Sequence, residues 1–208
     1  MFSREIFGQT PQYRSQGQKF TGLVYGRDAV CRRCGVFHAP DLTPGAGGFN
    51  LIACETDKTE LMASKVAASA DLKEKGMVGI LIDADGKIAL AVSGNTKKAN
   101  LVLAAAESIY QGLELAGDVN ILDYITNEEL GHCRSDGAAP PGNCAAPKLI
   151  GHAIAGSWKL PFAISEVWSD KKNVEKEKFN KNEPIESCIA CGKLVPLMMC
   201  SYWHNTHP

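Results

Sequence analysis

Three cysteines in the second half of the chain constrain its fold more than any other feature. Cys144 stands just ahead of an expected helix, and Cys188 and Cys191 lie one helical turn apart at the start of another. A free helix N-terminus supplies unpaired N–H groups and partial positive charge, and both stabilise a thiolate. Three such thiolates can hold one zinc ion with its fourth position open, as in catalytic zinc sites. The sequence therefore predicts a fold in which two helix N-termini meet.

The hydrophobic pattern predicts helices that alternate with strands along most of the chain. Expected helices cover 57 to about 76, 98–115, 144–157 and 188–199, and expected strands cover 77–82, 88–92 and 162–168. The first two strands flank a hairpin turn at 83–86. This order predicts an α/β fold, a mixed β-sheet covered by helices on its faces. After Cys200, one short closing strand at most could follow.

Length and composition predict one globular domain. The chain has 208 residues, and we expect a polar N-terminal arm over 1–25 and a single domain over 26–208. The net charge of -1 gives no global attraction to nucleic acid. No apolar run approaches the roughly 20 residues that span a bilayer, and the N-terminus lacks the apolar middle of a signal peptide. We therefore expect no membrane partner and a cytoplasmic location, where sparse Cys-x-x-Cys pairs favour metal binding over disulfides.

Two short motifs surround the three cysteines. They are Gly142-Asn143-Cys144-Ala145-Ala146-Pro147-Lys148 and Ser187-Cys188-Ile189-Ala190-Cys191-Gly192-Lys193. Together they resemble the signature of the cytidine deaminase-like superfamily of zinc-dependent nucleobase deaminases, in which His or Cys, Ala and Glu precede a Cys-x-x-Cys pair. The first motif is most similar to the Cys-Ala-Glu-Pro form of bacterial toxin-type deaminase domains. The likeness covers roughly residues 60–200, and it puts Ala146 at the position of the family's Glu.

The resemblance implies a three-layer α/β/α fold and a hydrolytic deaminase with Zn²⁺ held by Cys144, Cys188 and Cys191. Zinc would activate water for attack on the ring carbon that carries the amine. The family's Glu, whose position is taken by Ala146 in this chain, would transfer the protons. Ala146 has no titratable group, and losing an acid/base group costs roughly a hundredfold to ten-thousandfold in rate. We therefore expect the chain to bind zinc and turn over little or nothing. The intact motif around Ala146 favours an inactivated enzyme over a natural pseudoenzyme.

Substrate contacts are expected at the end of the hairpin. In nucleoside deaminases an Asn just past the equivalent strand binds the sugar, which points to Asn95, with Ser93, Gly94 and Asn143 beside it. Asn95 could instead be a turn residue that tolerates left-handed backbone geometry. The resemblance implies a nucleobase-containing substrate, free or in nucleic acid, with cytosine favoured by the family's commonest usage. It is also compatible with a homo-oligomer, with an immunity-type protein partner and with delivery from a secreted toxin.

A rival hypothesis uses a second cysteine pair, Cys31 and Cys34. Joined to Cys188 and Cys191, this pair would make a four-cysteine structural zinc site in a non-catalytic binding protein. The two pairs lie about 150 residues apart, whereas ribbon-type sites usually bring theirs within tens of residues. Metal geometry separates the two hypotheses, since one predicts three sulfurs and a water and the other four sulfurs.

Overall fold

The computed structural model describes residues 53–54, 57–69, 76–94, 96–133, 140–160, 162–169 and 189–206. The strands are β1 (Ala53–Cys54), β2 (Gly76–Ile82), β3 (Ile88–Val92), β4 (Leu113–Leu115) and β5 (Phe162–Ser169). The helices are α2 (Asp57–Ser69), α3 (Thr96–Glu107), α4 (Asn127–Cys133), α5 (Ala145–Ala155) and α6 (Ile189–Thr206), with a 3-10 turn, η1, at Ile121–Asp123. The expected N-terminal arm over 1–25 lies outside the described residues.

The strands form one mixed sheet in the order β1-β5-β2-β3-β4. Strand β2 runs antiparallel to both of its neighbours, β3 and β5, whereas β1 pairs with β5 and β4 pairs with β3 in parallel. The expected α/β fold with a mixed sheet is therefore confirmed. The register sets Gly79 of β2 opposite Glu166 of β5, at the centre of the sheet.

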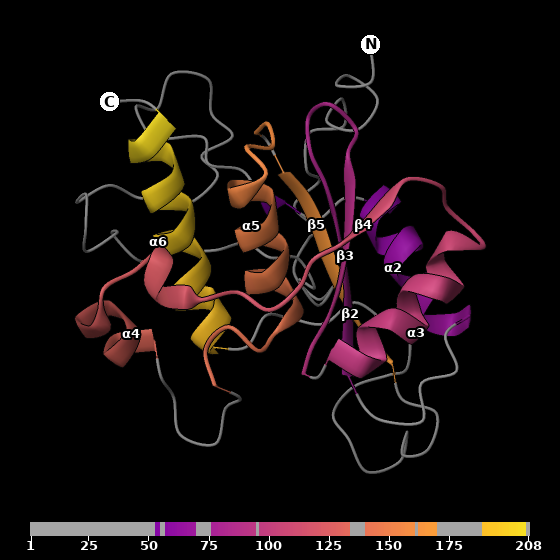
Figure 1. Ribbon diagram of the computed structural model, residues 1–208, viewed down its shortest axis with the longest axis horizontal. Coiled ribbons are helices and arrows are strands. Elements are labelled where there is room, and N and C mark those ends of the chain that lie inside the picture. The colour runs from indigo at the N-terminus through magenta and orange to yellow at the C-terminus, as the bar shows by residue number, and fades with distance from the viewer. Residues whose placement is uncertain are drawn as a thin grey trace, which may run out of the picture.

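Helices cover both faces of this sheet, which makes three layers (Figure 1). Helices α2 and α3 pack on one face, and α5 packs on the other. Helix α6 lies against α5, and the short α4 contacts α6. Each face has its own hydrophobic core. Among the described residues, no helix combines the length and apolarity needed to cross a bilayer.

Strand β5 shows how the sequence assigns side chains to the two faces. Because successive side chains of a strand point to opposite faces, Phe162 and Ile164 join the core beneath α5, and Ala163 and Val167 join the core beneath α2 and α3. Ser165, on the second of these faces, shares a 2.7 Å hydrogen bond with the Thr59 hydroxyl of α2. By the same alternation, Glu166 belongs to the α5 face.

The structure differs from the predicted elements between 108 and 115 and after 199. The expected helix over 98–115 is wrong in its second half, since α3 ends at Glu107 and Leu113–Leu115 form β4. Gly112 has a φ of 74°, which L side chains rarely adopt, and it turns the chain so that β4 pairs with β3. Helix α6 continues to Thr206, so the described residues after Cys200 contain helix and no closing strand. Helix α4 was not predicted.

Candidate functional site

Cys144 lies at the N-terminus of α5, as the sequence predicted. It is the N-cap residue, with extended backbone angles (φ -75°, ψ 160°), and its side chain makes no capping hydrogen bond. A tight turn delivers it, in which the Asn143 N–H donates to the Pro140 carbonyl at 3.1 Å. Gly142 in this turn has a φ of 95°, and a Cβ there would lie 2.7 Å from Ile121 Cγ1. Only glycine fits both conditions, so the turn fixes the entry of Cys144 into α5.

Cys191 lies in the first turn of α6, the helix that packs against α5. Its side chain is 2% exposed and belongs to the core beneath α5, and the half-buried Cys144 packs against that same core. Two of the three predicted zinc ligands therefore come from the N-terminal ends of neighbouring helices on one face of the sheet. Cys188 directly precedes α6 and lies outside the described residues, as do Cys31 and Cys34.

A zinc site requires at least three donor side chains grouped around one point. Among the described residues, no group of three or more His, Cys, Asp or Glu side chains could hold a metal ion. Cys144 and Cys191 are two such donors on adjoining helices. The predicted third, Cys188, stands three positions before Cys191 in the sequence. Zinc prefers thiolate ligands in this setting, and helix N-termini stabilise thiolates. Two thiols alone do not make a zinc site, so the predicted site would need Cys188 to complete it.

Ala145 and Ala146 form the first turn of α5, and both are fully buried. The backbone N–H of Ala146 donates a hydrogen bond to Glu166 Oε1 at 2.9 Å. Glu166 is itself only 4% exposed. A buried carboxylate thus reaches the α5 N-terminus from β5, at the residue where the deaminase resemblance would put a Glu.

Sequence reasoning missed Glu166, although one signal was available. Alternation along β5 puts it on the same face as Phe162 and Ile164, where the other side chains are apolar. A carboxylate on the buried face of a strand is unusual unless it has a polar partner. Its partner is the N-terminus of α5, which supplies an N–H group and the positive end of the helix dipole.

Gly79 makes room for this contact between helix and strand. A Cβ at Gly79 would lie 2.9 Å from Leu149 Cδ1, 3.1 Å from Ala145 Cβ and 3.4 Å from Glu166 Cγ. The absence of a side chain in the middle of β2 therefore lets the first turn of α5 approach the sheet closely. Sequence analysis did not single out this glycine either.

The hairpin end predicted to bind substrate lies beside the start of α5. The Gly94 N–H donates to the Asn143 carbonyl at 2.9 Å, and Lys148 Nζ donates to the Gly94 carbonyl at 2.8 Å. The Ser93 hydroxyl accepts the N–H of Met77 at 2.8 Å, which holds the strand end in place. Three of the four predicted substrate contacts, Ser93, Gly94 and Asn143, are therefore brought together. Asn95 lies outside the described residues.

Lys148 was not predicted to have a role at this site. Its side chain is almost completely buried, and Nζ also forms a 2.7 Å ion pair with Asp118, whose side chain is 69% exposed. Lys148 thus joins α5, the hairpin end at Gly94 and the segment before η1. It lies one helical turn from Cys144, so it holds the candidate substrate loop against the candidate metal ligand.

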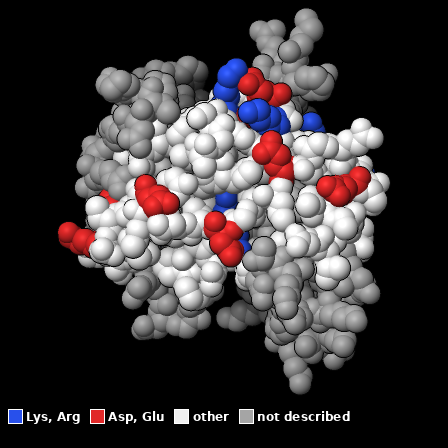
Figure 2. Space-filling view, viewed as in Figure 1, with Lys and Arg blue, Asp and Glu red and all other residues white. Residues whose placement is uncertain are grey.

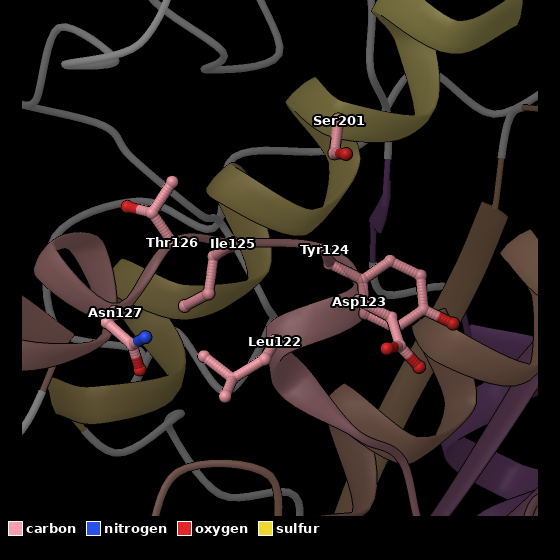
Figure 3. A pocket seen from close by; sticks show the side chains of 7 residues that line it. All are labelled: Leu122, Asp123, Tyr124, Ile125, Thr126, Asn127 and Ser201. Carbon is pink, nitrogen blue, oxygen red and sulfur yellow. The ribbon is translucent and has the colours of Figure 1, made fainter.

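An open hollow lies elsewhere, between the η1–α4 segment and α6 (Figure 3). It measures about 430 Å³ and is lined by residues 122–127 and Ser201. None of the predicted site residues borders it. We therefore place the candidate site at the N-terminus of α5 and not at this hollow.

In α4, burial raises the pKa of the Cys133 thiol above its ordinary value of 9.0. The charge of Lys193 lowers this pKa, and the charge of Glu129 raises it further.

Comparisons with known proteins add no relative. No protein-family model, curated protein or solved structure matches the chain. The deaminase resemblance consequently depends on the residues of the two cysteine motifs.

Proposed function

We propose that this protein is a zinc-dependent hydrolytic deaminase of an aminated nucleobase whose usual acid/base position is occupied by Ala146. The observation that carries the proposal is the arrangement of Cys144 and Cys191. They stand at the N-terminal ends of two packed helices, α5 and α6, on one face of a mixed sheet. Both cysteines belong to or pack against the same core, which supports a common metal site without Cys188 being described.

The residues of the site have distinct proposed roles. Cys144, Cys188 and Cys191 would hold the zinc, which when bound supplies a water activated for attack at neutral pH. Ser93, Gly94 and Asn95 would form the wall that binds the sugar, and Asn143 connects that wall to the zinc ligand through its carbonyl. Ala146 leaves α5 without the carboxylate that moves protons in this reaction. Turnover should therefore lie at least about a hundredfold below that of a counterpart with Glu at 146.

The net charge of -1 suits a small substrate better than a long polynucleotide. On the face shown in Figure 2, acidic side chains are scattered, and the basic ones gather mainly beside acidic ones near the hairpin turn. There Lys159 pairs with Asp85 at 2.9 Å. Binding to a long nucleic acid depends on a continuous basic surface, because released counterions supply much of the affinity. We therefore favour a free base, nucleoside or nucleotide, with cytosine as the first base to test.

Zinc content tests the metal site directly. Cys144→Ser, Cys188→Ser and Cys191→Ser should each lower the zinc found per chain in the purified protein, because each removes one thiolate. Cys200→Ser is the matched control, since Cys200 is a buried cysteine of the same helix α6 and no proposed ligand. Full zinc in all three ligand variants would contradict the site. Zinc lost from Cys31→Ser and Cys34→Ser, but kept in Cys144→Ser, would favour a four-cysteine structural site.

Restoring the carboxylate tests the reaction. Ala146→Glu should raise the release of ammonia from an aminated substrate by about a hundredfold or more, because it returns an acid/base group to the first turn of α5. Cytosine, cytidine, adenosine and a cytosine-containing oligonucleotide are the substrates to compare. Ala146→Gln is the control of equal size without a titratable group. If a folded, zinc-loaded Ala146→Glu protein leaves every substrate unchanged, the deaminase proposal is wrong.

A further inference from the structure

Glu166 is a buried carboxylate that the motif-based mechanism does not use. Strand β5 carries it on the α5 face of the sheet, in line with Phe162 and Ile164. Its side chain is 4% exposed, and its Oε1 accepts the N–H of Ala146 at 2.9 Å. The carboxylate therefore ends at the first turn of α5, at a residue two positions after Cys144.

Burial of this group needs a physical reason. An ionised carboxylate inside a protein is costly unless hydrogen bonds and positive charge compensate it. The N-terminus of α5 supplies an N–H donor and the positive end of the helix dipole. Phe162 and Ile164 occupy the neighbouring positions on the same face of the strand. Burying their apolar side chains carries none of the desolvation cost of a buried carboxylate.

Glu166 ends close to the atom from which a Glu side chain at position 146 would extend. Its Oε1 lies 2.9 Å from the Ala146 nitrogen, and the Ala146 Cβ is only two covalent bonds from that nitrogen. The oxygen is therefore within about 6 Å of the atom from which a Glu side chain at 146 would begin. The Glu166 carboxylate therefore reaches the first turn of α5 from strand β5, whereas the helix itself would carry a Glu at position 146.

We propose that Glu166 is the proton-transfer residue of this chain and replaces the carboxylate absent from position 146. The inference rests on the deaminase function proposed above, and it assigns to Glu166 the turnover that remains in the unaltered protein. It also distinguishes this chain from a protein that merely lacks its acid/base group.

The transfers balance with one carboxylate. The water oxygen bonds to the ring carbon that carries the amine, and Glu166 takes one water proton and gives it to the adjacent ring nitrogen. The second water proton passes through Glu166 to the amino nitrogen. The carbon–nitrogen bond then breaks, its electron pair leaves with ammonia, and the oxygen remains as a carbonyl. Glu166 ends in the protonation state in which it began.

Rescue between positions 166 and 146 tests this role. Glu166→Gln keeps an oxygen that can accept the Ala146 N–H, so the fold should persist, but it cannot transfer protons. With cytidine as substrate and equal zinc content, Glu166→Gln should lower ammonia release by about a hundredfold. Adding Ala146→Glu to Glu166→Gln should recover that loss, because the carboxylate returns to the same helix turn. Because Ala146→Glu should raise turnover in either background, the size of its gain is the diagnostic. The gain should be about a hundredfold larger with Gln at position 166 than with Glu166, whereas a purely structural Glu166 predicts equal gains.

A second readout needs neither zinc nor turnover. In the metal-free protein, Ala146→Glu should lower the Tm more when Glu166 is present than when it is Gln, because two carboxylates would then share one buried place. The steric cost of the larger side chain is common to both backgrounds and cancels in the double-mutant cycle. We expect a non-additivity of about 3 °C or more. Ala146→Gln, which adds the same volume without charge, should give additive Tm changes.

Each outcome bears on the inference. Loss of turnover in Glu166→Gln, a larger gain from Ala146→Glu in that background than in the unaltered one, and non-additive Tm values would support it. Unchanged turnover in Glu166→Gln, a loss without rescue, or additive Tm values would overturn it while leaving the deaminase proposal standing. No turnover in any zinc-loaded variant, including Ala146→Glu with Glu166→Gln, would overturn both. Glu114→Gln is the matched control, because Glu114 contacts the other end of α5 through His152 and should not affect turnover.

Discussion

Replacing Gly79 with Ala should destabilise the protein, because β2 and α5 leave no room for a methyl group between them. The new Cβ would lie 2.9 Å from Leu149 Cδ1 and 3.1 Å from Ala145 Cβ. Carbon atoms in favourable contact are about 3.5–4.0 Å apart, so both contacts would be short by roughly half an ångström. Overpacking of this kind costs about 1–3 kcal/mol.

The surroundings of Gly79 offer little relief. Leu149 and Ala145 are fully buried, and Ala145 has no side-chain torsion that could move its methyl group away. The first turn of α5 must therefore shift from the sheet. Alanine gains about 0.4–1 kcal/mol by restricting the unfolded chain, which offsets part of the cost. The net loss should be about 1–2 kcal/mol, or roughly 2–8 °C in Tm for a domain of this size.

Gly76 provides the control on the same strand. A Cβ there would meet Ser93 Oγ at 3.5 Å, an ordinary contact, so Gly76→Ala should change stability by no more than about 0.5 kcal/mol. Thermal unfolding followed by circular dichroism, together with zinc content, compares the two variants. Because the shift of α5 carries Cys144 with it, Gly79→Ala should also weaken binding at the proposed zinc site. Equal Tm values for the two variants would refute the packing argument.

Two further predictions concern Lys148 and alkaline pH. Lys148→Met should cost about 1–2 kcal/mol in a urea titration, because the Gly94 carbonyl loses its buried donor, whereas Asp118→Asn at the exposed end should cost under about 0.5 kcal/mol. An equal cost for both would contradict this. Burial raises the pKa of Cys133 above 9.0 and of Tyr124 and Tyr202 above 10.0, so the unfolded chain releases these protons first. Stability should therefore be retained below pH 9 and fall as the pH rises through the folded-state pKa values. A urea midpoint that stays constant from pH 7.5 to 10.5 would exclude this effect.

Local signals predicted the hairpin and the start of α5 closely. The apolar runs on either side of Asp83–Gly86 became β2 and β3 within one residue of the expected bounds. Inside the turn, Asp83 Oδ1 accepts the N–H groups of Asp85 and Lys87, which explains why an acidic residue begins it. Cys144 became the N-cap of α5, as its place before an apolar helix indicated. Each of these features depends on neighbours in sequence.

Features that depend on distant neighbours were missed. Strand β4 is three residues long, and only its parallel pairing with β3 distinguishes it from a continued helix. Gly112 was the local clue, because a glycine near the end of a helical pattern favours a turn. The contact between Lys148 and Gly94 joins positions 54 residues apart, so no local spacing predicts it.

Glu166 shows the same limitation within the candidate site. The motif describes an acid/base group by its distance along the chain from Cys144, and at that distance stands Ala146. Proton transfer depends instead on where a carboxylate lies in space. The register of β5 on β2 puts Glu166 opposite Gly79, and the missing side chain of Gly79 lets the first turn of α5 come down onto that strand pair. The resulting hydrogen bond between Ala146 and Glu166 brings a carboxylate from β5 to the helix turn that lacks one.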